Sequence, residues 1–202
     1  MRLLFTSLVM LALLPSVHAA EQDIGGVWVA SLCPPDVQRD SGKCASFVLE
    51  LHQQDGKLCG THLFSTAGAE RIDEGAAPSL VGDISDAAAR VTVVSGRSPV
   101  RVPAELKRAG NTLQWARLES PKGDYLLPPS ARLAKSKKKT MFAPMFEQEL
   151  KAACSSVFAM AAEAQRKQNE AAAPPGGTPL GGTPPNEAPR SDGSPSGGAP
   201  GR

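Results

Sequence analysis

Residues 45–65 read ASFVLELHQQDGKLCGTHLFS, and this stretch decides the fold of the chain. Apolar and polar residues alternate through 45–53, and a second apolar-rich segment runs over 58–65, which is typical of β-strands. Between them, Asp55-Gly56 is a dipeptide favoured in type I′ turns, because both central positions of such a turn need a positive φ. The stretch therefore predicts a β-hairpin with a two-residue turn.

The turn also fixes the register of this hairpin, with His52 opposite Cys59. Because side chains alternate between the two faces of a strand, one face of the hairpin is apolar and the other is mixed. On the mixed face, Val48, Cys59 and Leu63 form an apolar patch that another element must cover. The apolar face, which we expect to lie in the core, consists of Phe47, Leu49, Leu51, Leu58, Gly60, His62 and Phe64.

Short strands separated by turn residues continue on both sides of the hairpin, as is typical of an antiparallel sandwich or barrel. We predict a mainly β fold, an antiparallel up-and-down barrel of about eight strands that occupies residues 20–142. The expected strands are Ile24–Leu32, Ala45–Gln53, Leu58–Ser65, Ser79–Ser85, Arg90–Ser95, Val100–Arg108, Thr112–Glu119 and Tyr125–Leu133.

One helix is predicted after the strands, over residues 143–170, packed on the outside of the barrel. Ala143-Pro144 opens it, since proline suits the first turn of a helix. Apolar residues recur there at three- and four-residue spacing. These residues are Phe146, Leu150, Ala153, Cys154, Val157, Phe158 and Ala161. Residues 171–202 are rich in Pro and Gly without an apolar period, so we expect a disordered tail.

Residues 1–19 resemble a secretory signal peptide. Met1-Arg2 is positively charged, Leu3–Leu14 is apolar, and Val17-His18-Ala19 has the small-x-Ala pattern of a cleavage site. The apolar run is shorter than the roughly 20 residues that a membrane-spanning helix needs. We therefore predict an exported protein, periplasmic or secreted, without a transmembrane anchor.

All four cysteines lie beyond this segment, and in an oxidising compartment they predict two disulfides. Cys154 lies in the apolar stripe of the helix and Cys59 on the outer face of the hairpin, which favours a Cys59–Cys154 bond. Cys33 and Cys44 would then close the loop between the first two strands. A Cys44–Cys59 pair would need a different hairpin register, and Cys33–Cys59 with Cys44–Cys154 remains an alternative.

Gly26-Val27-Trp28 opens the first strand. A Gly-x-Trp motif there, followed by antiparallel strands and an outer helix, resembles the lipocalin family and related avidin-like barrels of the calycin type. The resemblance implies a tryptophan that closes the barrel floor and a cavity for a small apolar ligand. An eight-stranded barrel can also be filled by its own side chains, which is the state we favour here. The residues expected inside the barrel, and hence at any ligand, are Trp28, Phe47, His62, Phe64 and Trp115.

Other function classes find little support in the sequence. His52 and His62 have no nucleophile and carboxylate at a recognisable spacing, and Glu50 and Glu105 are expected to be exposed. A formal charge of +2 argues against broad binding of nucleic acid, and the basic run Arg132–Lys139 is expected to be solvated. The sequence contains no Cys-x-x-Cys pair, so its cysteine spacing argues against a metal site. We therefore expect no catalytic activity, no cofactor and no metal.

Two functions remain in view. The first is a binding module of the periplasm or extracellular space that holds a small apolar ligand, or an envelope protein, at the barrel mouth or its loops. The alternative is an inhibitor or protein-interaction domain that acts on an envelope or secreted hydrolase, through the loop between Cys33 and Cys44 or through the short segment before Ile24. A hydrolase, with a triad that sequence spacing does not reveal, is the least favoured hypothesis.

Overall fold

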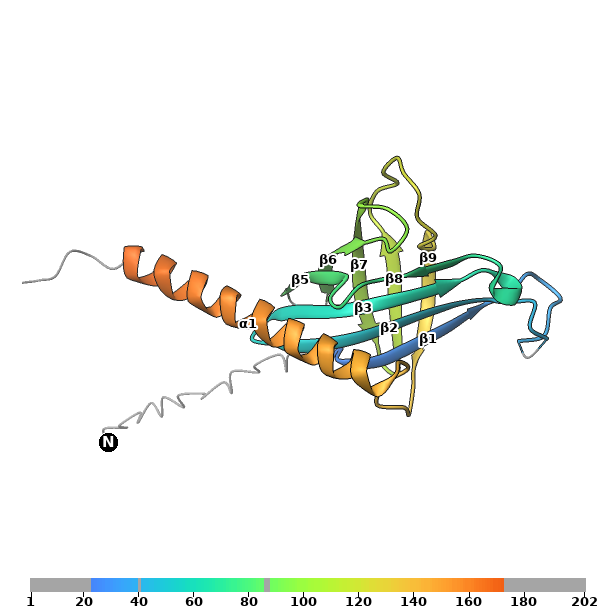
Figure 1. The fold of residues 1–202 in the computed structure, drawn as a ribbon, viewed down its shortest axis with the longest axis horizontal. Helices are drawn as coiled ribbons and strands as arrows, with labels where there is room; N and C mark the ends of the chain where they lie inside the picture. The colour runs from blue at the N-terminus through green and yellow to red at the C-terminus, as the bar shows by residue number, and fades with distance from the viewer. Residues whose placement is uncertain (1–22, 40, 86–87, 173–202) are drawn as a thin grey trace, which may run out of the picture.

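The computed structural model describes residues 23–39, 41–85 and 88–172. The expected signal peptide and all but the first two residues of the expected tail lie outside these residues. Figure 1 shows a β-barrel with one long helix beside it. Its elements are β1 Gly26–Leu32, β2 Ala45–Gln54, β3 Lys57–Ser65, the 3-10 helix η1 Ala67–Ala69, β4 Ile72–Glu74, β5 Leu80–Ser85, β6 Ala88–Val94, β7 Arg101–Ala109, β8 Thr112–Arg117, β9 Ser130–Lys135 and α1 Pro144–Ala172.

Eight of the strands close into an antiparallel barrel, as predicted. Neighbours around the barrel are β1, β2, β3, β5, β6, β7, β8 and β9, and β9 pairs with β1 to complete it. The short β4 pairs only with the end of β3. Because the barrel is closed, each of its eight strands pairs with a neighbour on both sides. This removes the main aggregation risk of an open sheet.

The hairpin of β2 and β3 has the predicted register. His52 lies opposite Cys59, and Leu49 lies opposite His62. Asp55 and Gly56 have φ values of 48° and 72°, so both turn positions are left-handed, as the type I′ turn requires. The hairpin therefore presents the predicted apolar face to the barrel interior.

Apolar side chains from all eight barrel strands form one buried cluster inside the barrel. The Phe47 and Trp115 rings meet edge to face with centroids 5.2 Å apart, and both side chains are at most 1% exposed. Trp28 lies near the N-terminal end of β1, where its Nε1 donates a 2.8 Å hydrogen bond to the carbonyl of Ile24. The Lys135 ammonium lies 5.4 Å from the Trp28 ring centroid, and the Trp28 side chain is fully buried.

Helix α1 packs on the outer face of β2 and β3 (Figure 1). Its buried side chains are Leu150, Cys154 and Phe158, spaced four residues apart on one face. Cys154 forms a disulfide with Cys59, and Cys33 forms one with Cys44. Both predicted bonds are confirmed, and such bonds fit a protein that folds outside the cytoplasm.

The helix continues well past the barrel (Figure 1), and residues 162–172 are exposed. Within the part of the chain that the structure describes, no helix combines the length and the apolarity needed to cross a bilayer.

Two strand predictions were incomplete. The last strand was expected at Tyr125–Leu133 but is β9, Ser130–Lys135, because Pro128 and Pro129 carry no N–H for a sheet ladder. The segment before them folds into a loop instead. The three-residue β4 was missed, since it is too short to show an alternating pattern.

The expectation that Glu50 is exposed was wrong, because its side chain lies under the segment that joins β9 to α1. Its carboxylate accepts hydrogen bonds from Thr140 Oγ1 at 2.9 Å and from the Met141 N–H at 3.2 Å. Glu105 is half-buried rather than exposed, and it pairs with Lys107 at 2.6 Å. Glu50 thus anchors the approach to the helix.

Removing the Cys59–Cys154 bond should destabilise the protein more than removing Cys33–Cys44. The bonded residues are 95 positions apart in the first case and 11 in the second. Chain entropy then gives losses of about 5 and about 3 kcal/mol for the two double alanine variants. Urea unfolding followed by tryptophan fluorescence measures both. Equal losses would show that the long-range bond adds nothing beyond a local one.

Candidate functional site

The long connections between barrel strands meet at one end, which we call the loop end. The opposite end has tight turns, such as the one at Asp55-Gly56, and the start of β1 with Trp28. Binding residues gather on loops that a rigid scaffold positions, so the loop end is the natural place to look for a site. The loop-end connections are residues 33–44, 66–79, 95–100 and 118–129.

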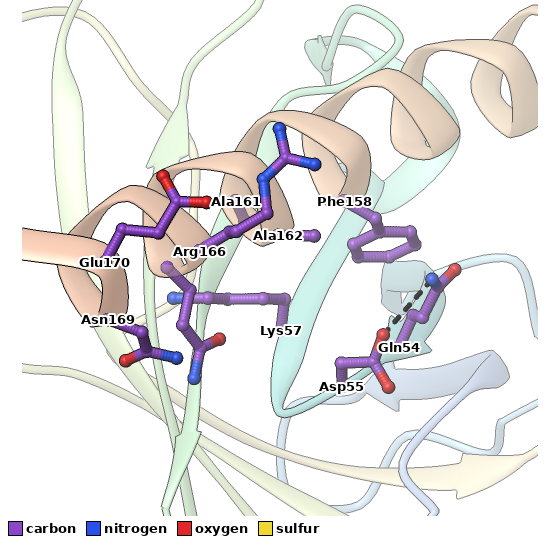
Figure 2. Close-up of a pocket in the computed structure, with 10 residues that line it drawn as sticks. Gln54, Asp55, Lys57, Phe158, Ala161, Ala162, Arg166, Asn169 and Glu170 are labelled. Carbon is purple, nitrogen blue, oxygen red and sulfur yellow. Dashed lines mark hydrogen bonds between the residues drawn. The ribbon is translucent and has the colours of Figure 1, made fainter. Parts of the chain in front are cut away.

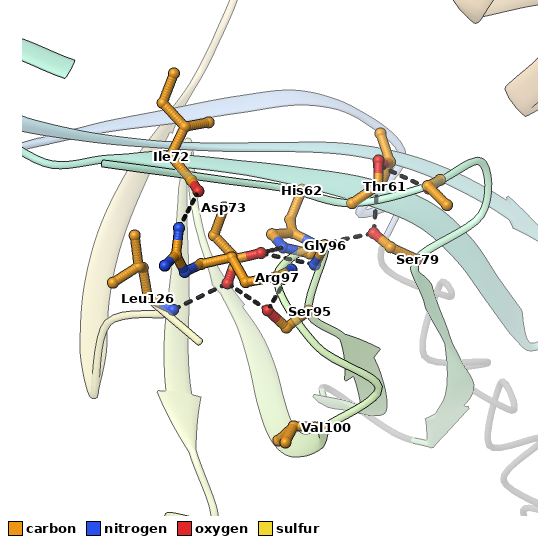
Figure 3. A network of polar contacts seen from close by, with 12 residues as sticks. Thr61, His62, Ile72, Asp73, Ser79, Ser95, Gly96, Arg97, Val100 and Leu126 are labelled. Carbon is orange, nitrogen blue, oxygen red and sulfur yellow. Dashed lines mark hydrogen bonds and ion pairs between the residues drawn. The ribbon is translucent and has the colours of Figure 1, made fainter. Parts of the chain in front are cut away.

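The carboxylate of Asp73 in β4 ties three of these connections together (Figure 3). Its Oδ1 accepts a 2.7 Å hydrogen bond from the N–H of Gly96. Its Oδ2 accepts bonds from Ser95 Oγ at 2.8 Å and from the N–H of Leu126 at 2.9 Å. The Nε2 of His62, on β3, lies 3.3 Å from Oδ1.

These donors decide the charge of Asp73, which is fully buried. Burial by itself raises the pKa of a carboxyl group. Hydrogen bonds from His62, Leu126 and Ser95 outweigh burial and lower the pKa of Asp73 from 3.8 to about 2. Asp73 is therefore a carboxylate at neutral pH, and its charge stabilises the loop end.

His62 also has a second partner that its sequence neighbours do not indicate. Its Nδ1 lies 2.8 Å from Ser79 Oγ, which is itself 3.2 Å from Thr61 Oγ1. Gly75 lies so close that a Cβ there would be 2.6 Å from His62 Nδ1, so glycine is required at this position. The fold thus places Ser79, His62 and Asp73 side by side.

A serine, a histidine and an aspartate in contact are also the components of a nucleophilic triad, but this cluster is closed to solvent. His62 and Asp73 are fully buried, and Ser79 is only 4% exposed. Ser79 faces Nδ1 of the ring rather than Nε2. We assign the cluster a structural role, since a substrate cannot reach Ser79 Oγ. Among the described residues, no group of His, Cys, Asp and Glu side chains is arranged to hold a metal ion.

An exposed ion pair makes a second contact to the 118–129 connection, besides the bond from Leu126 to Asp73. Arg97 donates from Nε and Nη2 to the two carboxylate oxygens of Asp124, at 2.9 and 2.8 Å. Its Nη1 donates to the carbonyl of Ile72 at 3.1 Å. The hydrogen bonds from Arg97 lower the pKa of Asp124. This connection is consequently fixed by both Asp73 and Arg97.

A groove of about 790 Å³ lies at the loop end, and we call it the mouth groove. Loops and strand ends line it together, mostly with half-buried apolar side chains. Two cations, Arg117 and Lys122, also line it. The apolar lining includes Leu32, Ala45, Phe64, Tyr125 and Leu126.

The residues expected at a ligand divide into two groups. Trp28, Phe47, His62 and Trp115 are at most 1% exposed, whereas Phe64 reaches the mouth groove. Tyr125 and Leu126 were not expected at a ligand, because their segment was predicted to be a strand. The sequence did predict that His62 faces inward. Because buried polar groups are nearly always hydrogen-bonded, this indicated buried polar partners at this end of the barrel.

A second groove, of about 550 Å³, lies between the end of α1 and the β2–β3 turn (Figure 2). Its apolar floor is made by Phe158 and two alanines of the helix. The acidic and basic side chains around it are balanced, so they favour no class of ligand. They are Asp55, Lys57, Arg166 and Glu170.

The chain has no significant match to a protein-family model, a curated protein or a solved structure. The barrel with its outer helix is consistent with the calycin-like architecture that the resemblance implies.

Replacing Asp73 should remove an acid-sensitive part of the stability. With a folded pKa of about 2 against 3.8, this carboxylate contributes about 2 kcal/mol above pH 4, and the contribution is lost as the pH falls from about 4 to about 2. Asp73→Asn should therefore lower the free energy of unfolding at pH 7 by about 2 to 3 kcal/mol and flatten its dependence on pH below 4. Urea unfolding at pH 7, 4 and 3 tests this.

Asp83→Asn is the matched control, because Asp83 forms an exposed ion pair with Lys57. Exposed pairs contribute about 1 kcal/mol or less. An Asp73→Asn protein as acid-sensitive as the wild type would contradict the assignment.

Proposed function

We propose that the protein is an exported, non-enzymatic binding module of the periplasm or extracellular space that holds a small apolar ligand in the mouth groove. The observation that carries this proposal is an apolar groove at the loop end of a barrel whose interior is packed with its own side chains. The lipocalin-like reading of Gly26-Val27-Trp28 supports a binding function, and the two disulfides support export.

The dimensions and composition of the groove support a small molecule. Ligand sites are typically concave and mostly apolar, with volumes of about 300 to 1,000 Å³ and a few polar groups. The mouth groove, at about 790 Å³, lies in this range.

The anchoring of the groove also supports binding. Leu126 lines it, and the N–H of Leu126 is held by Asp73. A preformed site loses little conformational entropy when a ligand binds.

Filling the groove should weaken ligand binding strongly. Ala45 begins β2 on the core side of the strand and lines the groove, so an indole in Ala45→Trp would occupy the ligand's space. We expect the neutral apolar dye Nile red to bind the wild type and to bind this variant at least about tenfold more weakly. Fluorescence titration measures both affinities.

Ala134→Trp is the control, since Ala134 is exposed on β9 and does not line the groove. Its dye affinity should equal that of the wild type, and thermal unfolding verifies that both variants fold. Dye binding that survives in Ala45→Trp would contradict the mouth groove as the site.

The loop between Cys33 and Cys44 favours a second function, an inhibitor or interaction domain that contacts a hydrolase. Most of its described residues are exposed, Arg39 and Lys43 among them, and the disulfide closes it. The Gly68 N–H also bonds to the carbonyl of Gly42, at 3.2 Å. A constrained, exposed loop with basic residues suits the active-site cleft of a serine protease that cleaves after Arg or Lys.

Trypsin provides the test of this second function. The wild type should inhibit it, and Arg39→Ala should weaken inhibition at least about tenfold if Arg39 occupies the specificity pocket. Rapid cleavage of the loop without inhibition would count against this function.

A further inference from the structure

We propose that the ligand of the mouth groove is an amphipathic anion, whose carboxylate binds Arg117 while its hydrocarbon chain lies along Leu32, Phe64 and Leu126. This inference rests on the proposed function and names the chemical class of the ligand. It follows from the hydrogen bonding of one guanidinium, from the charges around the groove and from its apolar lining.

Arg117 ends β8 and lines the groove, and its guanidinium is incompletely hydrogen-bonded. Its Nη1 donates a 2.7 Å bond to the hydroxyl of Tyr125, whose ring centroid lies 5.2 Å from the guanidinium carbon. Its Nε is shielded from water and has no hydrogen-bond partner among the described residues. A buried donor without an acceptor costs free energy that an incoming acceptor would recover.

Arg97 shows which acceptor fits this part of a guanidinium. Its Nε and Nη2 bind both oxygens of the Asp124 carboxylate. The Nε of Arg117 belongs to the same edge of its own guanidinium, and the bond to Tyr125 occupies Nη1 instead. A planar carboxylate can therefore bind Arg117 in the same two-bond arrangement after a side-chain shift that uncovers Nε, and this is the strong geometry for arginine.

The charges around the groove favour the same ligand class. Arg117 and Lys122 line it, and no aspartate or glutamate does. The nearby carboxylate of Asp124 is already paired with Arg97 and Arg71. An anionic head group is thus attracted to the groove and a cationic one is repelled.

The remaining lining is apolar and suits a short hydrocarbon chain in a monomeric ligand. Leu32, Ala45 and Phe64 come from the ends of three strands, and Leu126 faces them from the 118–129 loop. Recognition of an anionic membrane surface typically uses clusters of about four to eight Lys and Arg residues. Only two cations line this groove, which favours a single amphiphile over a bilayer.

Three amphiphiles with ten-carbon chains and different head groups test the proposal. Isothermal titration calorimetry, with each amphiphile kept monomeric, measures their affinities. We expect decanoate to bind the wild type at least about tenfold more tightly than decanol, and decyltrimethylammonium to bind no better than decanol. Arg117→Met, which keeps the apolar stem, should weaken decanoate at least about tenfold and change decanol by less than about twofold.

Arg132→Met is the matched control, because Arg132 is exposed on β9 away from the groove. It should leave decanoate binding unchanged. If Arg117→Met does not fold, Lys122→Met serves in its place, since Lys122 is exposed at the groove. It should weaken decanoate by about threefold and leave decanol unaffected.

Failure of this inference can be told apart from failure of the proposed function. Equal binding of decanoate and decanol, both lost in Ala45→Trp, would overturn the anion and keep the groove as an apolar site. Binding of neither amphiphile and of no Nile red would overturn both proposals. Sedimentation with phosphatidylglycerol vesicles, without binding of monomeric decanoate, would overturn the inference in favour of a membrane surface.

Discussion

The loop end of this barrel depends on one buried charge, the carboxylate of Asp73. Three connections that are remote in sequence each contribute to it, through β4, through Ser95 and Gly96, and through the N–H of Leu126. Without the carboxylate these donors would be left without an acceptor in an interior that excludes water. The hydrogen bonds hold its pKa at about 2 despite complete burial, so Asp73 is charged at neutral pH.

The carboxylate of Asp73 holds the loop end, which is distinct from the packed interior of the barrel and carries the mouth groove. The inward side chains of the strands fill the barrel, and Phe47, Trp28 and Trp115 are buried in this core. The surface left for recognition is built from strand ends and loops, where side chains such as Tyr125 are only half-buried. A lipocalin-like sequence pattern can thus belong to a barrel whose interior is closed, and the binding surface that we propose lies at its mouth.

Two arginines at the loop end differ in how completely their guanidinium groups are hydrogen-bonded. Arg97 has its donors satisfied by Asp124 and by the carbonyl of Ile72, and it fixes a loop. Arg117, on β8, has one bond to Tyr125 and an Nε without a partner among the described residues. Satisfied donors stabilise the fold, whereas an unsatisfied donor beside an apolar groove is a feature that a ligand can complete. The sealed Ser79–His62 contact belongs to the first kind, although its residue types resemble a catalytic site.

The amino-acid sequence alone determined the barrel, the outer helix and the β2–β3 register, and it favoured the Cys59–Cys154 bond over the other pairings. Each of these follows from short-range rules: alternation along a strand, a turn that needs two positive φ values, and four-residue spacing that places Cys154 on the buried face of the helix. Only the tertiary structure decided that Asp73 and Ser79 flank His62, that Glu50 is buried, and that Arg117 lies in an apolar groove. Those contacts join loops whose paths are set by packing between distant strands, and no local pattern of residues encodes such paths.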